Sequence, residues 1–187
     1  TIGSYTYNGS SQGPNTATNT GTGTSYTYSY VNSGGTTYGP SATRPTNAGN
    51  YTVTATVAAN GNYGAASSSA TSFTIAIGTT TFTSTGWSNG VPNAFKDAVI
   101  SYDYTSSANF TANSLTVNNS AVVTIPSTYN VILNGALAIT SGSFTLANNA
   151  NLIQVDNVSN SGVITVNRDS NALFRFDYTM WSSPVTG

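Results

Sequence analysis

Apolar residues alternate strictly with polar ones in three short segments of the first 77 residues. These segments are residues 25–31 (SYTYSYV), 51–57 (YTVTATV) and 72–77 (SFTIAI). Successive side chains of a strand point to opposite faces of a sheet, so each segment presents one apolar and one polar face. Turn signals rich in Gly and Asn separate the segments. The pattern predicts a small module of antiparallel strands over residues 1–77, with one face in water.

A repeat follows in the second half of the chain. Apolar positions coincide with a period of 21 to 22 residues when residues 115–136 are aligned with residues 137–157 and 158–178. The coinciding positions are Leu115 with Leu137, Val117 with Ile139, Ile125 with Leu146 and Val131 with Leu152, then Ile164 with Phe144, Val166 with Leu146, Leu173 with Leu152 and Phe176 with Val155. A unit this short cannot bury a core alone, whereas stacked units pair equivalent strands in parallel around an apolar interior. The repeat predicts a right-handed parallel β-helix or β-solenoid over residues 86–187, with a β-sandwich of short strands as the alternative.

The ends of the repeat region show weaker patterns. Residues 98–104 and 109–112 are expected to form a degenerate first coil, and residues 86–92 (GWSNGVP) to cover its exposed end. Residues 78–85 are predicted to be a linker between module and solenoid. Because the chain opens on Thr1, we expect an interior piece of a longer protein whose last coil leads into a further domain.

Composition supports an all-β chain and removes several classes of partner. Only 5% of residues are charged, Glu and His are absent, and Ser, Thr, Asn and Gly fill the polar positions. Four basic residues at a net charge of -1 cannot neutralise a run of phosphates, so nucleic acid and anionic membranes are not expected partners. No apolar run approaches the roughly 20 residues that a membrane span needs. Without cysteine there is no disulfide and no thiolate metal site.

The first half resembles a known repeat module. The stretches YNGSSQGP at 7–14, RPTNAGNYTVTATV at 44–57, NGNYGAAS at 60–67 and the closing FTIA resemble MBG-type repeat modules of large bacterial surface proteins. The resemblance implies a small β-rich fold, immunoglobulin-like or grasp-like, that serves as a spacer or adhesive unit along a stalk.

The second half resembles segments of very large secreted proteins of Bacteroidota. The stretches that carry this resemblance are GWSNGVPNAFKDAVI at 86–100 and NLIQVDNVSNSGVITVNRDSNALFRFDYTMWSSPV at 151–185, which ends in a DYxxWSSPV motif. It implies export by type IX secretion and a location outside the cell or at its surface. The sorting domain of such proteins is not present in this sequence.

Four side chains near the end of the chain are candidates for a structural seam. We expect the last coil to be covered by Arg168, Arg175, Asp177 and Trp181. Without such a cover, its open edge could pair with a strand of another chain.

Asp156 and Asp177 lie one period apart and would be close together in a regular stack. We favour a ladder of turn residues, with Asn134 one period earlier. A calcium site is the second interpretation, because carboxylate and amide oxygens are calcium ligands. A catalytic pair is the third, because glycosidases use two carboxylates. With no Glu or His to complete acid–base chemistry, we predict that the chain is not an enzyme and, calcium aside, has no cofactor.

Three further patterns bear on binding. Lys96 among many Asn residues would suit an intramolecular isopeptide bond, but no acidic helper is identifiable. Threonine rows on solenoids bind ice, yet Thr116 aligns with Ala138 and then Ser159, so this row does not persist. Tyr26, Tyr28 and Tyr30 share one face, and we favour a core role over a platform for sugars.

These observations favour a non-enzymatic segment of an extracellular adhesin or surface filament. It would act as a structural stalk and as an adhesive surface for other surfaces or glycans, and neighbouring copies in a filament are candidate partners. The alternative is a non-catalytic carbohydrate-binding module of a secreted multidomain enzyme.

Overall fold

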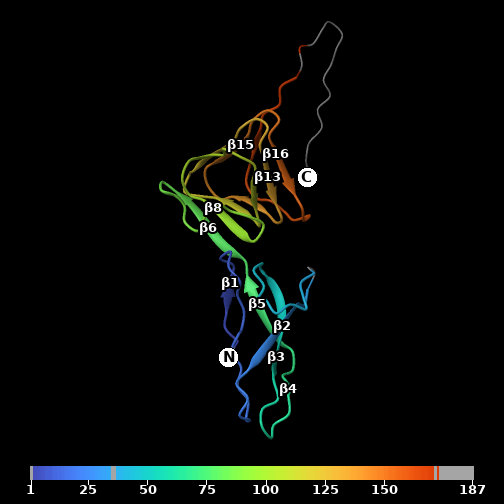
Figure 1. Ribbon diagram of the computed structural model, residues 1–187. Coiled ribbons are helices and arrows are strands. Elements are labelled where there is room, and N and C mark those ends of the chain that lie inside the picture. Colours follow the sequence, from blue (N-terminus) through green and yellow to red (C-terminus); the bar gives the residue numbers. More distant parts are fainter. Residues whose placement is uncertain (1, 35–36, 171, 173–187) are drawn as a thin grey trace.

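The computed structural model describes residues 2–34, 37–170 and 172, and within them every regular element is a β-strand (Figure 1). The strands form one sheet over the first 76 residues and three sheets over the remainder. The all-β prediction is therefore confirmed. Within the described ranges, no helix has the length and apolar character that crossing a membrane would require.

The N-terminal module is a single mixed sheet with the order β1-β5-β3-β2, and β4 pairs with β3. Its strands are β1 (Tyr5–Thr6), β2 (Tyr26–Asn32), β3 (Gly49–Val57), β4 (Ala66–Ser67) and β5 (Thr71–Ala76). The alternating segments account for the long strands β2, β3 and β5, which pair antiparallel as expected. β1 pairs with β5 in parallel.

Aromatic side chains form the core of the module. Tyr30, Tyr51 and Phe73 are at most 4% exposed, and the Phe73 ring contacts both tyrosine rings, with Tyr51 stacked on it at a centroid distance of 5.6 Å. The buried phenols donate hydrogen bonds to backbone carbonyls, Tyr30 Oη to Pro14 O at 2.6 Å and Tyr51 Oη to Asn47 O at 2.9 Å. Each ring therefore anchors a loop to the sheet as well as filling the core.

Residues 78–85, expected as a linker, contain strand β6 (Gly78–Thr83), which pairs in parallel with β8 (Lys96–Ile100) of the solenoid. The linker prediction is wrong for residues 78–83, because they form a strand with a parallel partner. Only Ile77 separates β5 from β6, so the chain passes from module to solenoid almost without interruption (Figure 1). This position explains why Ile77 is 36% exposed instead of belonging to the module core.

Side-chain contacts also join the two parts. The Phe95 ring packs on the module core and lies 5.4 Å from the Tyr7 ring, between centroids. Asn93 Nδ2 donates to Tyr7 Oη at 3.0 Å, and Gly78 N donates to Phe95 O at 3.0 Å. A Cβ atom at Gly78 would lie 2.6 Å from Tyr7 O. The backbones of residues 7 and 78 are therefore so close that only glycine fits at position 78.

The solenoid has three parallel faces. The first contains β6, β8, β11 (Leu115–Val117) and β14 (Leu137–Ile139), with β7 (Gly86–Trp87) added antiparallel to β6. The second contains β9 (Tyr104–Thr105), β12 (Val122–Ile125), β15 (Ser143–Leu146) and β17 (Thr165–Val166). The third contains β10 (Phe110–Ala112), β13 (Asn130–Leu133) and β16 (Asn151–Gln154). The chain visits the faces in turn through about four turns, which confirms the solenoid and excludes the sandwich.

The register follows the repeat seen in the sequence. Leu115 pairs with Leu137, Val117 with Ile139, Ile125 with Leu146, Val131 with Leu152 and Leu146 with Val166, all as predicted. The inward side chains of β10, β11, β12 and β13 are almost fully buried in one continuous core, and Ile139 and Leu152 of the following turn are half-buried against it. The expected positions of Leu173 and Phe176 lie outside the described residues.

The first coil, predicted to be degenerate, is present as β8, β9 and β10, and aromatic rings cover its open end. Trp87 contacts Phe82, Tyr104 and Phe110, with centroid distances of 5.3 to 5.8 Å. Trp87 therefore caps the apolar interior as expected, because a coil at the end of a stack has no further coil to cover it.

A substitution at Gly142 can test how tightly the coils are stacked. It has φ +98°, and a Cβ there would overlap the Ala121 carbonyl oxygen of the preceding coil. Gly86 has a similar φ of +102° but nothing near its Cβ position, so it is the matched control. We expect Gly142→Ala to lower the free energy of unfolding by about 3 kcal/mol and Gly86→Ala by about 1 to 2 kcal/mol. Urea unfolding followed by circular dichroism measures both, and equal losses would contradict close stacking at Gly142.

The buried tyrosines predict alkaline sensitivity of the module. Burial raises the pKa of the Tyr30 and Tyr51 phenols above the usual 10.0. The neutral phenols therefore stabilise the fold fully below about pH 10, and this stability is lost as the pH rises through the folded pKa. Urea unfolding from about pH 8 to about pH 12 should show the loss.

Tyr51→Phe should flatten the dependence of stability on pH, although it also removes the hydrogen bond to Asn47. Tyr63→Phe, at a 53% exposed ring, is the control. An unchanged slope in Tyr51→Phe would show that the buried phenol is not responsible.

Candidate functional site

Of the four residues predicted to form the seam, the structure describes Arg168. Arg175, Asp177 and Trp181 lie outside the described residues. The half-buried Arg168 side chain reaches back one period, where Nη1 donates to Ala147 O at 3.3 Å and Nη2 to Ala150 O at 2.9 Å. A guanidinium has five donors in a fixed fork, so one side chain can bind carbonyls on both sides of a turn. Arg168 thus holds its own turn against the preceding one.

The predicted Asp156–Asp177 pair is not brought together within the described residues, because Asp177 lies outside them. Asp156 is exposed, and its backbone N donates to Asn134 O at 2.9 Å, so these two residues are neighbours on adjacent coils. Among the described residues, no group of three or more His, Cys, Asp or Glu side chains could hold a metal ion. A calcium site at Asp156 and Asp177 stays a prediction.

Two other carboxylates accept hydrogen bonds from the next coil. Asp97 Oδ1 accepts from Asn113 Nδ2 and Ser114 Oγ, both at 2.7 Å, and Asp103 Oδ1 accepts from Val122 N at 2.8 Å. These acids therefore stabilise the turns to which they bind.

Lys96 is 8% exposed, and its Nζ donates to the carbonyls of Asn89 and Val91. It therefore anchors the 88–92 segment over the first coil. The Asn89 amide is itself engaged with Thr79 O at 3.3 Å. This arrangement fits a cap better than an isopeptide bond.

An asparagine ladder that the sequence analysis missed follows the turn before the third face. Asn109 Oδ1 accepts from Asn130 N at 3.0 Å, and Asn130 Oδ1 accepts from Asn151 Nδ2 at 2.9 Å. Its signal in the sequence is Asn at a constant spacing of 21 residues. It lies at a different turn from the predicted ladder of Asn134, Asp156 and Asp177, of which the structure describes the first two as neighbours on adjacent coils.

A row of four threonines was also not predicted from the sequence. Thr105, Thr124, Thr145 and Thr165 pair with one another at the same outward position of the second face. Thr105 and Thr165 are exposed, and Thr124 and Thr145 are half-buried. In the described part of the chain their hydroxyls have no hydrogen-bond partner. On the first face, where the sequence predicted no persistent threonine row, Thr116 pairs with Ala138 and Ala138 pairs with Ser161 instead of Ser159.

These four threonines form a regular array. Parallel strands lie about 4.7 to 4.9 Å apart, so hydroxyl and methyl groups recur at that interval along the stack. β-Branched side chains have few rotamers, which keeps the array ordered without a ligand. The threonine row can therefore offer several hydrogen bonds at once to a surface with many acceptors.

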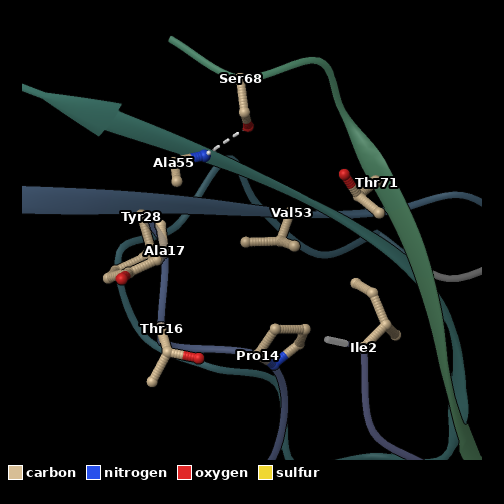
Figure 2. A pocket seen from close by; sticks show the side chains of 9 residues that line it. All are labelled: Ile2, Pro14, Thr16, Ala17, Tyr28, Val53, Ala55, Ser68 and Thr71. Atoms are coloured by element: carbon tan, nitrogen blue, oxygen red, sulfur yellow. Dashed lines mark hydrogen bonds between the residues drawn. The ribbon is translucent and has the colours of Figure 1, made fainter. Parts of the chain in front are cut away.

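The module contains a cavity of about 270 Å³ between its sheet and two loops (Figure 2). Val53 and Ala55 come from β3 and Tyr28 from β2, while Pro14 and Thr16 belong to the loop that crosses the sheet. Tyr28 is half-buried and stacks on Tyr30 with centroids 6.4 Å apart, so it belongs partly to the core and partly to the cavity wall. No charged side chain lines this cavity.

Comparison with known proteins yields one match. The model of a family described as a domain of unknown function, DUF8693, matches residues 72–187, from β5 to the end of the chain. The search of curated proteins and the search of solved structures returned no match.

Asp97 is the acid whose removal should matter most to the stack. Asp97→Ala would leave the Asn113 amide and the Ser114 hydroxyl without their acceptor, and we expect a loss of about 1 to 3 kcal/mol in the free energy of unfolding. Asp97→Asn keeps one oxygen acceptor and should lose less than half as much. Urea unfolding compares the two variants, and equal stability of Asp97→Ala and the parent would show that these bonds contribute nothing.

Proposed function

The chain belongs to the DUF8693 family, and from its own residues we propose that it is a non-enzymatic segment of an extracellular adhesin or surface filament. In this role the solenoid is a stiff stalk, and its outer faces, which carry few charges, adhere to surfaces or glycans. The observation that carries the proposal is the threonine row, which places the same pair of groups, hydroxyl and methyl, on four successive coils.

The stalk role is supported by how the parts are joined. Load applied along the stack is shared by parallel backbone hydrogen bonds on three faces, and the inward side chains form one core through the turns. No flexible linker separates the module from the solenoid, because a single residue lies between β5 and β6 and Phe95 packs on the module core. A segment built this way transmits force without first extending a linker.

An extracellular setting agrees with the composition. A chain with four Lys and Arg residues offers few sites to proteases that cleave at basic residues. Export by type IX secretion, the MBG-type assignment of the module with its immunoglobulin-like or grasp-like fold, and the right hand of the solenoid belong to this proposal. They rest on the resemblances in the sequence.

The alternative is a non-catalytic carbohydrate-binding module of a secreted multidomain enzyme. The observation that favours it is the cavity in the module, where an aromatic side chain and hydroxyls meet in a neutral pocket. The two proposals place binding on different parts of the chain, so variants can separate them.

The threonine row is tested by removing hydroxyls while keeping side-chain shape. We expect the double variant Thr124→Val/Thr145→Val to lower the amount of protein retained on silica and on a glycan array several-fold, because the valine methyl cannot donate or accept a hydrogen bond. Adsorption measured on a quartz crystal microbalance gives the comparison.

The matched control is Thr111→Val/Thr116→Val, which makes the same exchange at half-buried outward positions of the other two faces. Equal losses in both double variants would contradict a specific role of the threonine row. Adhesion that neither variant changes would exclude the solenoid faces as the adhesive surface.

A further inference from the structure

We propose that the cavity of the N-terminal module is a binding site for one neutral pyranose residue, such as the terminal sugar of a glycan. The inference rests on the carbohydrate-binding alternative and goes further, because it names the residues and the class of ligand. In Figure 2, Tyr28, Ala17 and Thr16 lie on one side of the cavity and Ile2 and Thr71 on the other, with Val53 and Pro14 between them.

The size of the cavity selects a small ligand. At about 270 Å³ it falls just below the range of pockets that hold drug-sized molecules, which begins at about 300 Å³. A single sugar ring fits this space, whereas a second ring would have to lie outside. The site therefore suits the end of a glycan chain better than its middle.

The walls are already held in place without a ligand. Tyr30 Oη donates to Pro14 O at 2.6 Å and ties the crossing loop to β2. On the other wall, Ala55 N donates to Ser68 Oγ at 3.1 Å, and Ser68 N donates to Ala55 O at 2.8 Å. A preformed cavity costs less ordering on binding than a mobile one, which matters for a ligand with few contacts.

Hydrogen bonds within the protein leave two hydroxyls available. Ser68 Oγ donates to Ser69 O at 2.9 Å and Thr71 Oγ1 to the same carbonyl at 3.3 Å, so both of these donors are used. The hydroxyls of Thr16 and Tyr28 have no hydrogen-bond partner in residues 2–34, 37–170 and 172. Each can donate one bond and accept others.

The remaining lining selects against charged ligands. Ile2, Pro14, Val53 and Ala55 are apolar, and a carboxylate or phosphate placed among them would lose its hydration without a cation to replace it. A pyranose is neutral, has an apolar face of C–H groups for the aromatic ring and side walls, and carries hydroxyls at its edge. These are the groups that the cavity can satisfy.

The test uses the full chain and nuclear magnetic resonance titration with neutral monosaccharides, namely glucose, galactose, mannose, fucose and N-acetylglucosamine. We expect at least one to bind saturably, with a Kd of about 1 mM, and to shift the signals of Ile2, Thr16, Tyr28 and Val53. Thr16→Val should weaken binding about tenfold, because it removes a hydroxyl and keeps the shape. Tyr28→Phe should weaken it by a similar factor, and Tyr28→Ala should abolish it.

Tyr63→Phe, at an exposed tyrosine that does not line the cavity, is the matched control, and thermal melts confirm that each variant folds. Failure of all five sugars to shift the cavity signals would overturn the inference, as would binding that Thr16→Val and Tyr28→Ala leave unchanged. Cavity shifts seen with benzene alone would also overturn it and mark the cavity as an apolar site.

Adhesion measured on the same variants separates this inference from the proposed function. Loss of adhesion in Thr124→Val/Thr145→Val together with no sugar binding would overturn the cavity site and leave the adhesive stalk standing. Sugar binding that Tyr28→Ala abolishes, in a chain that adheres to no surface, would support the cavity site and overturn the adhesive stalk.

Discussion

The second half of the molecule depends on parallel backbone pairing between residues one period apart. From β8 to β17 its strands are two to five residues long, too short to be stable alone, and each is stabilised by pairing with the equivalent segments of neighbouring coils. The pairing places Leu115 beside Leu137 and Val131 beside Leu152, so apolar columns run through the stack. Hydrogen bonds and hydrophobic burial therefore support the same register.

The same constraint arranges the polar side chains of the turns. Asn109, Asn130 and Asn151 form a ladder because the pairing brings each turn over the previous one. Arg168 binds carbonyls of the preceding turn for the same reason, and Asp97 accepts bonds from the turn that follows it. In a chain with so few charges, these contacts act within the stack and leave its outer faces to hydroxyl, amide and small apolar groups.

The proposed adhesive face and the proposed sugar site both lie on surfaces that carry few charges, but they would recognise ligands differently. The threonine row offers one repeated contact along the stack, which suits an extended or irregular surface with many acceptors. The cavity offers a few contacts in a small, half-open hollow, which suits one small neutral group. The junction around Tyr7, Gly78 and Phe95 places both on one connected unit, so a ligand held by the module would be mechanically coupled to the solenoid.

The sequence by itself determined the features that local periodicity carries. Alternation over residues 51–57 predicted β3, and the 21 to 22 residue period predicted the inward pairs such as Ile125 with Leu146, because the two-residue and one-coil periods are properties of neighbouring residues. Composition determined the all-β class in the same way. The sequence also predicted the cap at Trp87, because residues 86–92 come directly before the first coil.

Tertiary structure alone decided the features that depend on coil length and on closure between distant segments. The threonine row needs coils of unequal length, from Thr105 to Thr124 and then to Thr145 and Thr165, so a constant period does not reveal it. β6 looked like a linker because its partner, β8, is a later segment of the chain. The cavity joins Ile2, Thr16, Val53 and Thr71, which no local pattern relates, and only the packing of a loop against the sheet brings them together.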